Sequence, residues 1–196
     1  MRRHFPLLVA AALHAGVAIA SAAHAAEREP DVNYIPTPQH VVDDMLRLVD
    51  LRPGDTLYDL GSGDGRIPIT AARRYGIRAV GIDIDPVRID EAEANAREQG
   101  VAHLVAFRQE DLFAADFSDA TVVTLYLFPD LNLKLRPRLL ATLKPGTRIV
   151  SHRFDMGNWQ PDKTLTIGDT AVYFWTVPQP TTPAPRTPPA DATGLP

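Results

Sequence analysis

The stretch YDLGSGDGRIPITAA, Tyr58–Ala72, decides the fold. A strand expected over Thr56–Leu60 runs into a turn with three glycines, and a helix expected over Arg66–Tyr75 follows. Pro68 is compatible with this helix because it lies in the first turn. A strand, a glycine-rich turn and a helix in this order are typical of α/β folds whose turn holds a phosphate, a dinucleotide or an adenosyl group.

The segments around this stretch alternate between helix and strand signals. Apolar residues recur at helical spacing from Val41 to Val49, with Thr37 as the expected helix cap and Pro38 at the first helical position. Further strands are expected over 77–85, 104–111, 120–128, 147–154, 164–168 and 170–177. Helices are expected over 86–100 and in a stretch that ends at Leu143 and is broken near Pro137. This order predicts an α/β fold with a doubly wound, mostly parallel sheet, helices on both faces and an antiparallel edge.

The glycine turn fits an adenosyl ligand better than a phosphate. An NTPase loop needs Gly-Lys-Ser/Thr, but Gly65 is followed by Arg66 and an isoleucine. A dinucleotide fingerprint needs a sixth-position glycine, where Arg66 stands. Asp59 precedes the turn, while Asp83 and Asp111 end the second and third strands. Three carboxylates would repel a pyrophosphate and attract adenosine that carries a cationic amino acid, as in S-adenosylmethionine.

Several motifs resemble those of one enzyme family. YDLGSGDGR, AVGIDIDP and QEDLF look like the first three motifs of class I, seven-strand S-adenosylmethionine-dependent methyltransferases. NYIPTPQHVVDDML, DATVVTLYL, LKPGTRIVSH and the W-x-P at Trp159–Pro161 resemble the branch that contains archaeal broad-specificity protein-lysine methyltransferases and their mitochondrial relatives. The resemblance covers residues 31–177 and departs from the branch at both ends of the chain.

The resemblance implies a seven-strand Rossmann-like sheet, S-adenosylmethionine as the cofactor and protein lysine as the methyl acceptor. Other acceptors, a small molecule or RNA, are alternatives within the same enzyme class. An exported adenosyl-ligand binding protein that has kept the fold without turnover is the alternative from another class. A dehydrogenase is disfavoured by the missing sixth-position glycine.

The expected cofactor-binding residues come from four segments. They are Tyr34, Pro36, Thr37, Asp59, Gly61, Ser62, Gly63, Asp83, Ile84 and Asp111. Asp59 is expected to hold the ammonium group, and Asp83 the ribose hydroxyls. Asp111, or its neighbour Glu110, is expected to accept from the adenine amino group. The glycines let the backbone approach the methionine moiety closely. The resemblance implies that the amino-terminal segment folds over the cofactor.

Three aromatic residues are the catalytic candidates. Tyr34, Tyr126 and Phe154 are expected at the carboxyl rim of the sheet, where they would orient and desolvate a lysine amine. The alternative is that they are ordinary packing residues. An apolar collar favours the neutral, reactive amine by lowering the pKa of the lysine. His152 also falls near the rim, but the sulfonium is already activated, so no dedicated base is predicted.

The composition of the chain limits which ligands and partners it is expected to bind. The chain has 196 residues and a net charge of −4, so no general nucleic-acid binding is expected. It has no cysteine, which excludes disulfides and thiolate metal sites. The acidic pair Asp83 and Asp85 has no further ligands at metal spacing, so no metal is predicted.

The two ends of the chain differ from its middle. Residues 1–25 read as a cleavable export signal, with Arg2 and Arg3, an apolar stretch and a small-residue site that predicts cleavage between Ala25 and Ala26. Removal of this signal would change the net charge to −6 and leave no stable membrane span. The expected methyltransferase domain is 26–177, followed by a Pro-rich, disordered tail over 178–196. The predicted location is the periplasm, or the cytosol if the signal is not used.

Overall fold

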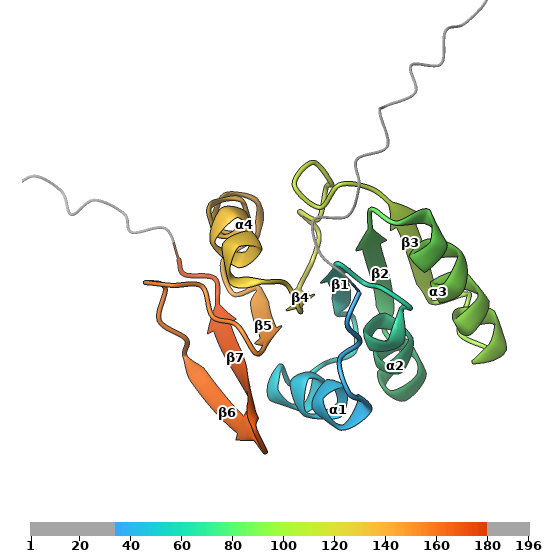
Figure 1. The fold of residues 1–196 in the computed structure, drawn as a ribbon, viewed down its shortest axis with the longest axis horizontal. Helices are drawn as coiled ribbons and strands as arrows, with labels where there is room; N and C mark the ends of the chain where they lie inside the picture. Colours follow the sequence, from blue (N-terminus) through green and yellow to red (C-terminus); the bar gives the residue numbers. More distant parts are fainter. Residues whose placement is uncertain (1–33, 180–196) are drawn as a thin grey trace, which may run out of the picture.

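The computed structural model describes residues 34–179, and the expected signal over 1–25 and most of the expected tail lie outside them. Seven strands form one sheet (Figure 1). The strands are β1 Thr56–Leu60, β2 Arg78–Asp83, β3 Val105–Gln109, β4 Val122–Leu125, β5 Arg148–His152, β6 Lys163–Ile167 and β7 Thr170–Thr176. The helices are α1 Gln39–Leu48, α2 Arg66–Tyr75, α3 Pro86–Glu98 and α4 Pro129–Thr142.

The strand order is β3-β2-β1-β4-β5-β7-β6. The first five strands run parallel, and β7 lies antiparallel between β5 and β6. The prediction of a mostly parallel seven-strand sheet with an antiparallel edge is therefore confirmed. The order reverses at β1, whose Asp59 pairs with Gly81 of β2 on one side and Thr124 of β4 on the other. In such sheets ligands bind in the crevice outside the carboxyl ends of the strands at this point.

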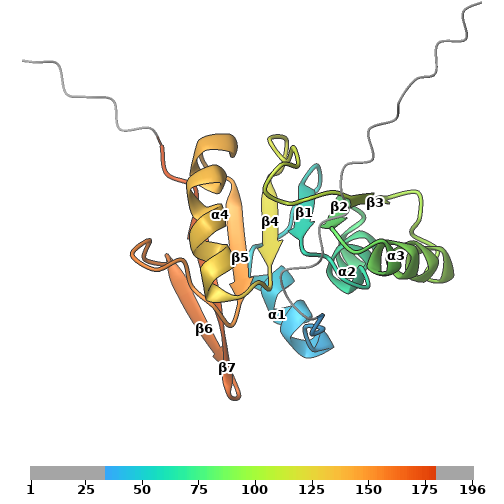
Figure 2. The same ribbon diagram turned by 45° about the horizontal axis from the view of Figure 1, so that its top comes forward.

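The helices cover both faces of the sheet, with α1, α2 and α3 on one face and α4 on the other (Figures 1 and 2). Val42 and Met45 of α1 pack in one core with Leu57 and Val150 of the sheet. Leucines of α4 pack with the opposite side of the same strands. The β3–β4 connection contains no helix, and its Phe117 fills the α4 side of the core instead.

Three local expectations were wrong. Pro38, not Thr37, is the N-cap of α1, and it has no side-chain oxygen to bond the helix. The Pro137 ring lies inside an unbroken α4, on its exposed side, where water can satisfy the carbonyl group that the missing N–H leaves free. β4 ends at Leu125, so Tyr126 leaves the sheet and turns toward its carboxyl rim.

Within residues 34–179, the structure contains no helix long and apolar enough to cross a membrane.

Candidate active site

A cavity of about 470 Å³ opens at the carboxyl ends of β1, β2, β3 and β4. Its volume suits a small organic ligand. The predicted residues that line it are Tyr34, Pro36, Thr37, Asp59, Gly61, Asp83, Ile84, Asp111 and Tyr126. The structure thus gathers residues from four strand ends and the amino-terminal segment around one space. Ser62, Gly63 and Phe154 do not line it.

Asp83 is held in place by the backbone around it. The N–H of Gly63 donates to one carboxylate oxygen at 2.8 Å, and the N–H of Asp85 donates to the other at 3.0 Å. A carboxylate has about four acceptor positions, so these two bonds leave lone pairs for a ligand. Asp83 also lines the cavity, so it can accept hydrogen bonds from a ligand's hydroxyl groups there.

The Tyr34 ring lies so close to the backbone of residue 63 that only glycine fits at this position. Its φ is 52°, and a Cβ atom at this position would lie 2.3 Å from Cε2 of Tyr34. A side chain would therefore displace the Tyr34 ring and strain the backbone. The glycine acts through its N–H and through the space it leaves for Tyr34. Ser62 is buried nearby, and its Oγ has no hydrogen-bond partner among the described residues.

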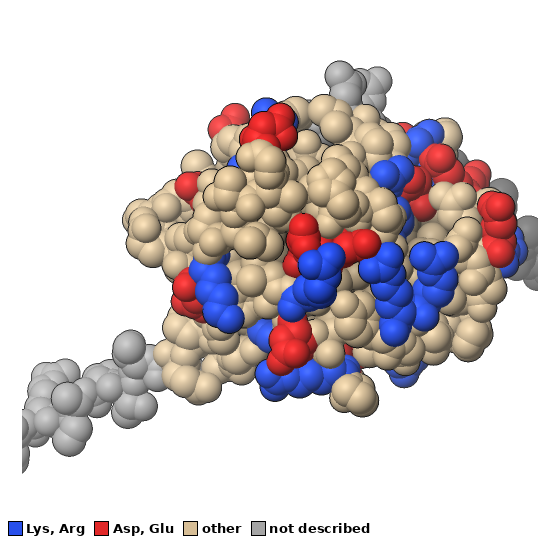
Figure 3. All heavy atoms as spheres, turned by 90° about the horizontal axis from the view of Figure 1, so that it is seen from below, with Lys and Arg blue, Asp and Glu red and all other residues tan. Residues whose placement is uncertain are grey.

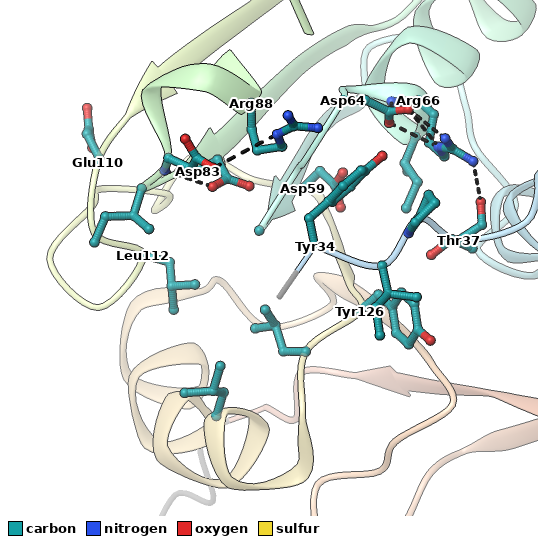
Figure 4. A pocket seen from close by; sticks show the side chains of 18 of the residues that line it. Tyr34, Thr37, Asp59, Asp64, Arg66, Asp83, Arg88, Glu110, Leu112 and Tyr126 are labelled. Atoms are coloured by element: carbon teal, nitrogen blue, oxygen red, sulfur yellow. Dashed lines mark hydrogen bonds and ion pairs between the residues drawn. The ribbon is translucent and has the colours of Figure 1, made fainter. Parts of the chain in front are cut away.

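The Tyr34 ring, from the amino-terminal segment, lies against Gly63 of the glycine turn, and Figure 4 shows the side chain beside Asp64. Burial, with the nearby Asp64 carboxylate adding repulsion, raises the pKa of Tyr34 to about 12. The Arg88 guanidinium lies 4.9 Å from the ring centroid. Arg66 pairs with Asp64 at 2.6 Å and donates to the Thr37 carbonyl at 3.0 Å. These contacts hold the segment against the cavity.

Asp59 is a buried carboxyl group at the floor of the cavity. Its exposed fraction is 2%, and Thr124 Oγ1 donates to it at 2.6 Å. Burial, with Asp83 and Asp64 adding repulsion, raises the pKa of Asp59 to about 8. Within residues 34–179 no lysine or arginine pairs with it. Such a group favours a ligand that brings a positive charge.

The far end of the cavity follows β3. Glu110 and Asp111 both line it, and Leu112 adds an apolar wall. The N–H of Phe113 donates to the Asp111 carboxylate at 2.9 Å, so one oxygen of this acid also stabilises its own turn. The predicted choice between Asp111 and Glu110 as the adenine acceptor stays a prediction, because both side chains reach the cavity.

Three aromatic side chains, Tyr126, Phe154 and Phe128, form an aromatic row beside the cavity. Tyr126 lines the cavity, and its ring centroid lies 6.4 Å from that of Phe154 at an interplanar angle of 20°. Phe154 lies 6.0 Å from Phe128, which is 43% exposed. The row therefore runs from the cavity wall to the surface.

His152 packs behind Tyr126, with ring centroids 4.1 Å apart. Its Nδ1 lies 3.3 Å from Thr37 Oγ1, and its Nε2 lies 3.1 Å from Thr170 Oγ1. Burial, with Arg153 adding repulsion, lowers the pKa of His152 to about 4. The imidazole is therefore neutral at pH 7, and both of its nitrogens already have partners.

Sequence reasoning missed other residues that line the cavity. They are Ile35, Asp64, Arg66, Ile67, Asp85, Arg88, Leu112, Phe113, Leu127 and Leu131. Asp64 and Arg66 lie inside the glycine motif and form an ion pair. Two opposite charges beside the turn could have indicated from the sequence that both side chains lie near the site. Arg88 gave no signal, because a charged residue early in a helix is ordinary. No group of three or more metal-ligating side chains occurs in the described part of the chain.

Comparison with known proteins places the chain in a family. The ANTKMT methyltransferase domain family matches residues 59–163. A protein-lysine N-methyltransferase from Saccharolobus islandicus (strain REY15A) is 44% identical over 141 residues, which are 71% of this chain and 88% of that protein. The adenine nucleotide translocase lysine N-methyltransferase of Mus musculus is 34% identical over 147 residues, 74% of this chain and 63% of that protein.

A solved structure is also similar. The crystal structure of an RNA methyltransferase from Salinibacter ruber, in complex with S-adenosyl-L-homocysteine, has 60% sequence identity and a TM-score of 0.73. The similarity covers 74% of this chain and 95% of that one.

The cavity fits the cofactor that these relatives imply. S-adenosylmethionine carries an ammonium and a sulfonium cation, and Asp59, Asp83 and Asp111 line the cavity. Among the described residues two arginines also line it, and each is paired with acids: Arg66 with Asp64, and Arg88 with Asp85 and Glu91. The buried Asp59, which has no cationic partner among the described residues, is the group that a ligand ammonium would satisfy. The chain belongs to the ANTKMT methyltransferase domain family and is an S-adenosylmethionine-dependent methyltransferase.

Proposed function

We propose that this enzyme transfers a methyl group to the side-chain amine of lysine in proteins. The observation that carries the proposal is the 44% identity to an archaeal protein-lysine N-methyltransferase, over 88% of that protein. The mouse translocase lysine N-methyltransferase supports it at lower identity, although this chain spans only 63% of that protein.

The chain's own residues have distinct roles in binding. Asp83 holds the ribose hydroxyls, since its carboxylate is fixed by two backbone N–H groups and lines the cavity. Asp59 holds the ammonium group, and Asp111 or Glu110 accepts from the adenine amino group. Tyr34 covers this space from the amino-terminal side. S-adenosylmethionine supplies the electrophilic methyl group when bound.

The aromatic row receives the acceptor. Tyr126 lies at the cavity wall, and Phe154 and Phe128 continue from it toward the surface. Aromatic faces attract an arriving ammonium, and an apolar wall then favours loss of its proton. The lone pair of the neutral amine would attack the methyl carbon while the bond from that carbon to sulfur breaks, which leaves S-adenosylhomocysteine and a methylated ammonium that can lose its proton to water. Positioning therefore supplies much of the rate. His152 packs against Tyr126 and does not line the cavity, so we assign it no part in proton transfer.

RNA is the second candidate acceptor, favoured by the 60% identity to the RNA methyltransferase from Salinibacter ruber. Three observations favour protein over RNA. The net charge is −4, and the cavity is lined by several acidic residues, which repel a polyanion. On the face that Figure 3 shows, basic and acidic side chains are interspersed rather than gathered into a basic stripe.

One assay separates the candidates. The purified protein is incubated with S-adenosylmethionine carrying a labelled methyl group and with either a lysine-containing protein or total RNA. We expect label in the protein and methyl-lysine by mass spectrometry. Label in RNA with unmodified lysines would contradict the proposed protein acceptor and assign RNA instead. Cofactor binding without any methyl transfer would favour a binding protein.

We also propose that the chain is exported to the periplasm after cleavage between Ala25 and Ala26, leaving a catalytic domain over 26–177 and the tail over 178–196. The support is the order of charged, apolar and small residues in the first 25 positions.

A further inference from the structure

The backbone turns sharply where β5 ends. The N–H of Phe154 donates to the His152 carbonyl at 2.9 Å, which closes a three-residue turn around Arg153. Arg153 has a φ of 68°, and its own N–H donates to the Ala171 carbonyl of β7 at 2.7 Å. A turn of this kind is strained for a residue with a side chain, and it persists only where neighbouring contacts fix it.

Asn132 and Ser151 fix this turn, and we refer to them as the Asn132–Ser151 clasp. Ser151 Oγ donates to the Phe154 carbonyl at 2.7 Å and accepts from Asn132 Nδ2 at 3.3 Å. Asn132 Nδ2 also lies 3.2 Å from the carbonyl oxygens of Phe154 and Asp155. Since every group around this nitrogen accepts, the amide must face them with its N–H₂ side.

The buried amide of Asn132 lowers the stability of the fold, so a packing role alone does not explain its presence. Asn132 is fully buried, and its Oδ1 has no hydrogen-bond partner among the described residues. A buried acceptor without a partner is unfavourable, and a leucine at this position would avoid the penalty. The role of the Asn132 amide is therefore to hold the backbone of Phe154 in place through its N–H₂ group.

We propose that Asn132 and Ser151 are positioning residues for the methyl acceptor. They hold Phe154 nearly parallel to Tyr126 and next to Phe128, so that the aromatic row accepts the four-carbon stem of a lysine. This inference rests on the proposed function. The clasp does not contact Asp59 or Asp83, so it acts on the acceptor and not on the cofactor.

The test compares Ser151→Ala and Asn132→Leu with the wild type. We expect the KM for a lysine peptide to rise on the order of tenfold in both variants, because Phe154 loses its fixed position. The Kd for S-adenosylhomocysteine, measured by calorimetry, should stay unchanged. Leu139→Ala is the matched control, because Leu139 is buried on the same helix away from the clasp. It should lower the melting temperature and leave both constants unchanged.

The outcomes separate this inference from the proposed function. An unchanged KM in folded Ser151→Ala, or a KM that rises equally in Leu139→Ala, would overturn the clasp alone. A KM and a cofactor Kd that rise together would assign these residues to general stability and also overturn it. A wild-type protein that binds S-adenosylhomocysteine and methylates no lysine would overturn both proposals. Ser151→Ala removes one oxygen atom, so it keeps the test valid if Asn132→Leu does not fold.

Discussion

The backbone N–H of Gly63 donates to the Asp83 carboxylate at 2.8 Å, which joins the glycine turn after β1 to the end of β2. The same glycine leaves space for the Tyr34 ring. Gly63 therefore both orients Asp83, which faces the cavity, and makes room for Tyr34, which covers it.

Asp83→Ala should weaken binding of S-adenosylhomocysteine by about 2–4 kcal/mol, because buried ribose hydroxyls would lose a charged acceptor. Calorimetry at pH 7.5 measures the loss, and thermal unfolding without ligand separates it from damage to the fold. Asp85→Ala, which keeps its backbone N–H, is the matched control and should bind with much smaller loss. Unchanged affinity in Asp83→Ala would remove this acid from the ligand site.

Cofactor affinity should depend on pH through Asp59. Because burial raises the pKa of Asp59 to about 8, this carboxyl group is neutral below that pH and ionised above it. A ligand ammonium binds the ionised form, so the affinity for S-adenosylhomocysteine should increase up to about tenfold per pH unit from pH 6 to pH 8. Asp59→Asn should abolish this dependence.

Methylthioadenosine is the control for this experiment, since it lacks the amino acid and its affinity should change little with pH. The ligand-free protein has the opposite dependence. A raised carboxyl pKa in the folded state stabilises the fold below the unfolded pKa, and that contribution is lost as the pH rises through about 8. A flat affinity profile for both ligands would contradict the role of Asp59.

Gly63→Ala should weaken cofactor binding mainly by displacing Tyr34. The added methyl group would lie 2.3 Å from the Tyr34 ring, in a backbone conformation with a φ of 52°. In a Tyr34→Ala background the same substitution should cost less, and a double-mutant cycle on the calorimetric Kd should give a coupling of about 1 kcal/mol or more. Additive losses would show that the ring and the glycine act independently.

The sequence predicts most of the fold because local signals and tertiary packing agree there. β1 and α2 have the predicted bounds, since an apolar strand, a glycine turn and an amphipathic helix each carry their own signal. The end of β4 was predicted too late, because Tyr126 and Phe128 are good strand residues. The strand ends where its partner ends, since Leu125 pairs with Leu60, the last residue of β1, and the sequence of β4 alone does not indicate this.

The site is predictable to the same extent. Acids at strand ends can be found from topology, and Asp59, Asp83 and Asp111 do meet at one cavity. Contacts across long separations leave no such pattern. The Arg66 bond to the Thr37 carbonyl and the Asn132 bond to the Phe154 carbonyl join residues 29 and 22 positions apart, and neither chain segment signals its partner.

Arg148→Met should lower the free energy of unfolding by about 3 kcal/mol at pH 7, because it leaves the buried Asp55 carboxylate without its cation. Burial alone would raise the pKa of Asp55, but its bonds to Arg148 and neighbouring donors lower it. The stabilisation is therefore present above about pH 4 and lost as the pH falls further, so urea denaturation at pH 3 should show a smaller difference. Arg52→Met, which removes an exposed pair with Asp50, should leave stability unchanged.

S-adenosylmethionine is a cytosolic metabolite, yet the chain opens with Arg2, Arg3 and an apolar stretch that are typical of an export signal. The sequence MRRHFPL is only a partial twin-arginine signal, because Met1 and Pro6 depart from its pattern, so the ordinary secretory route is the one we expect. The twin-arginine route is the alternative, and it would carry the domain out already folded with its cofactor bound.

We expect Edman sequencing of the native protein to begin at Ala26, in the periplasmic fraction. Replacement of Arg2 and Arg3 by lysine distinguishes the two routes, because a twin-arginine signal requires the pair and an ordinary secretory signal needs only positive charge. Retention of this variant in the cytosol would indicate the twin-arginine route. An intact Met1 in the cytosolic fraction of wild-type cells would contradict export and give the enzyme direct access to its methyl donor.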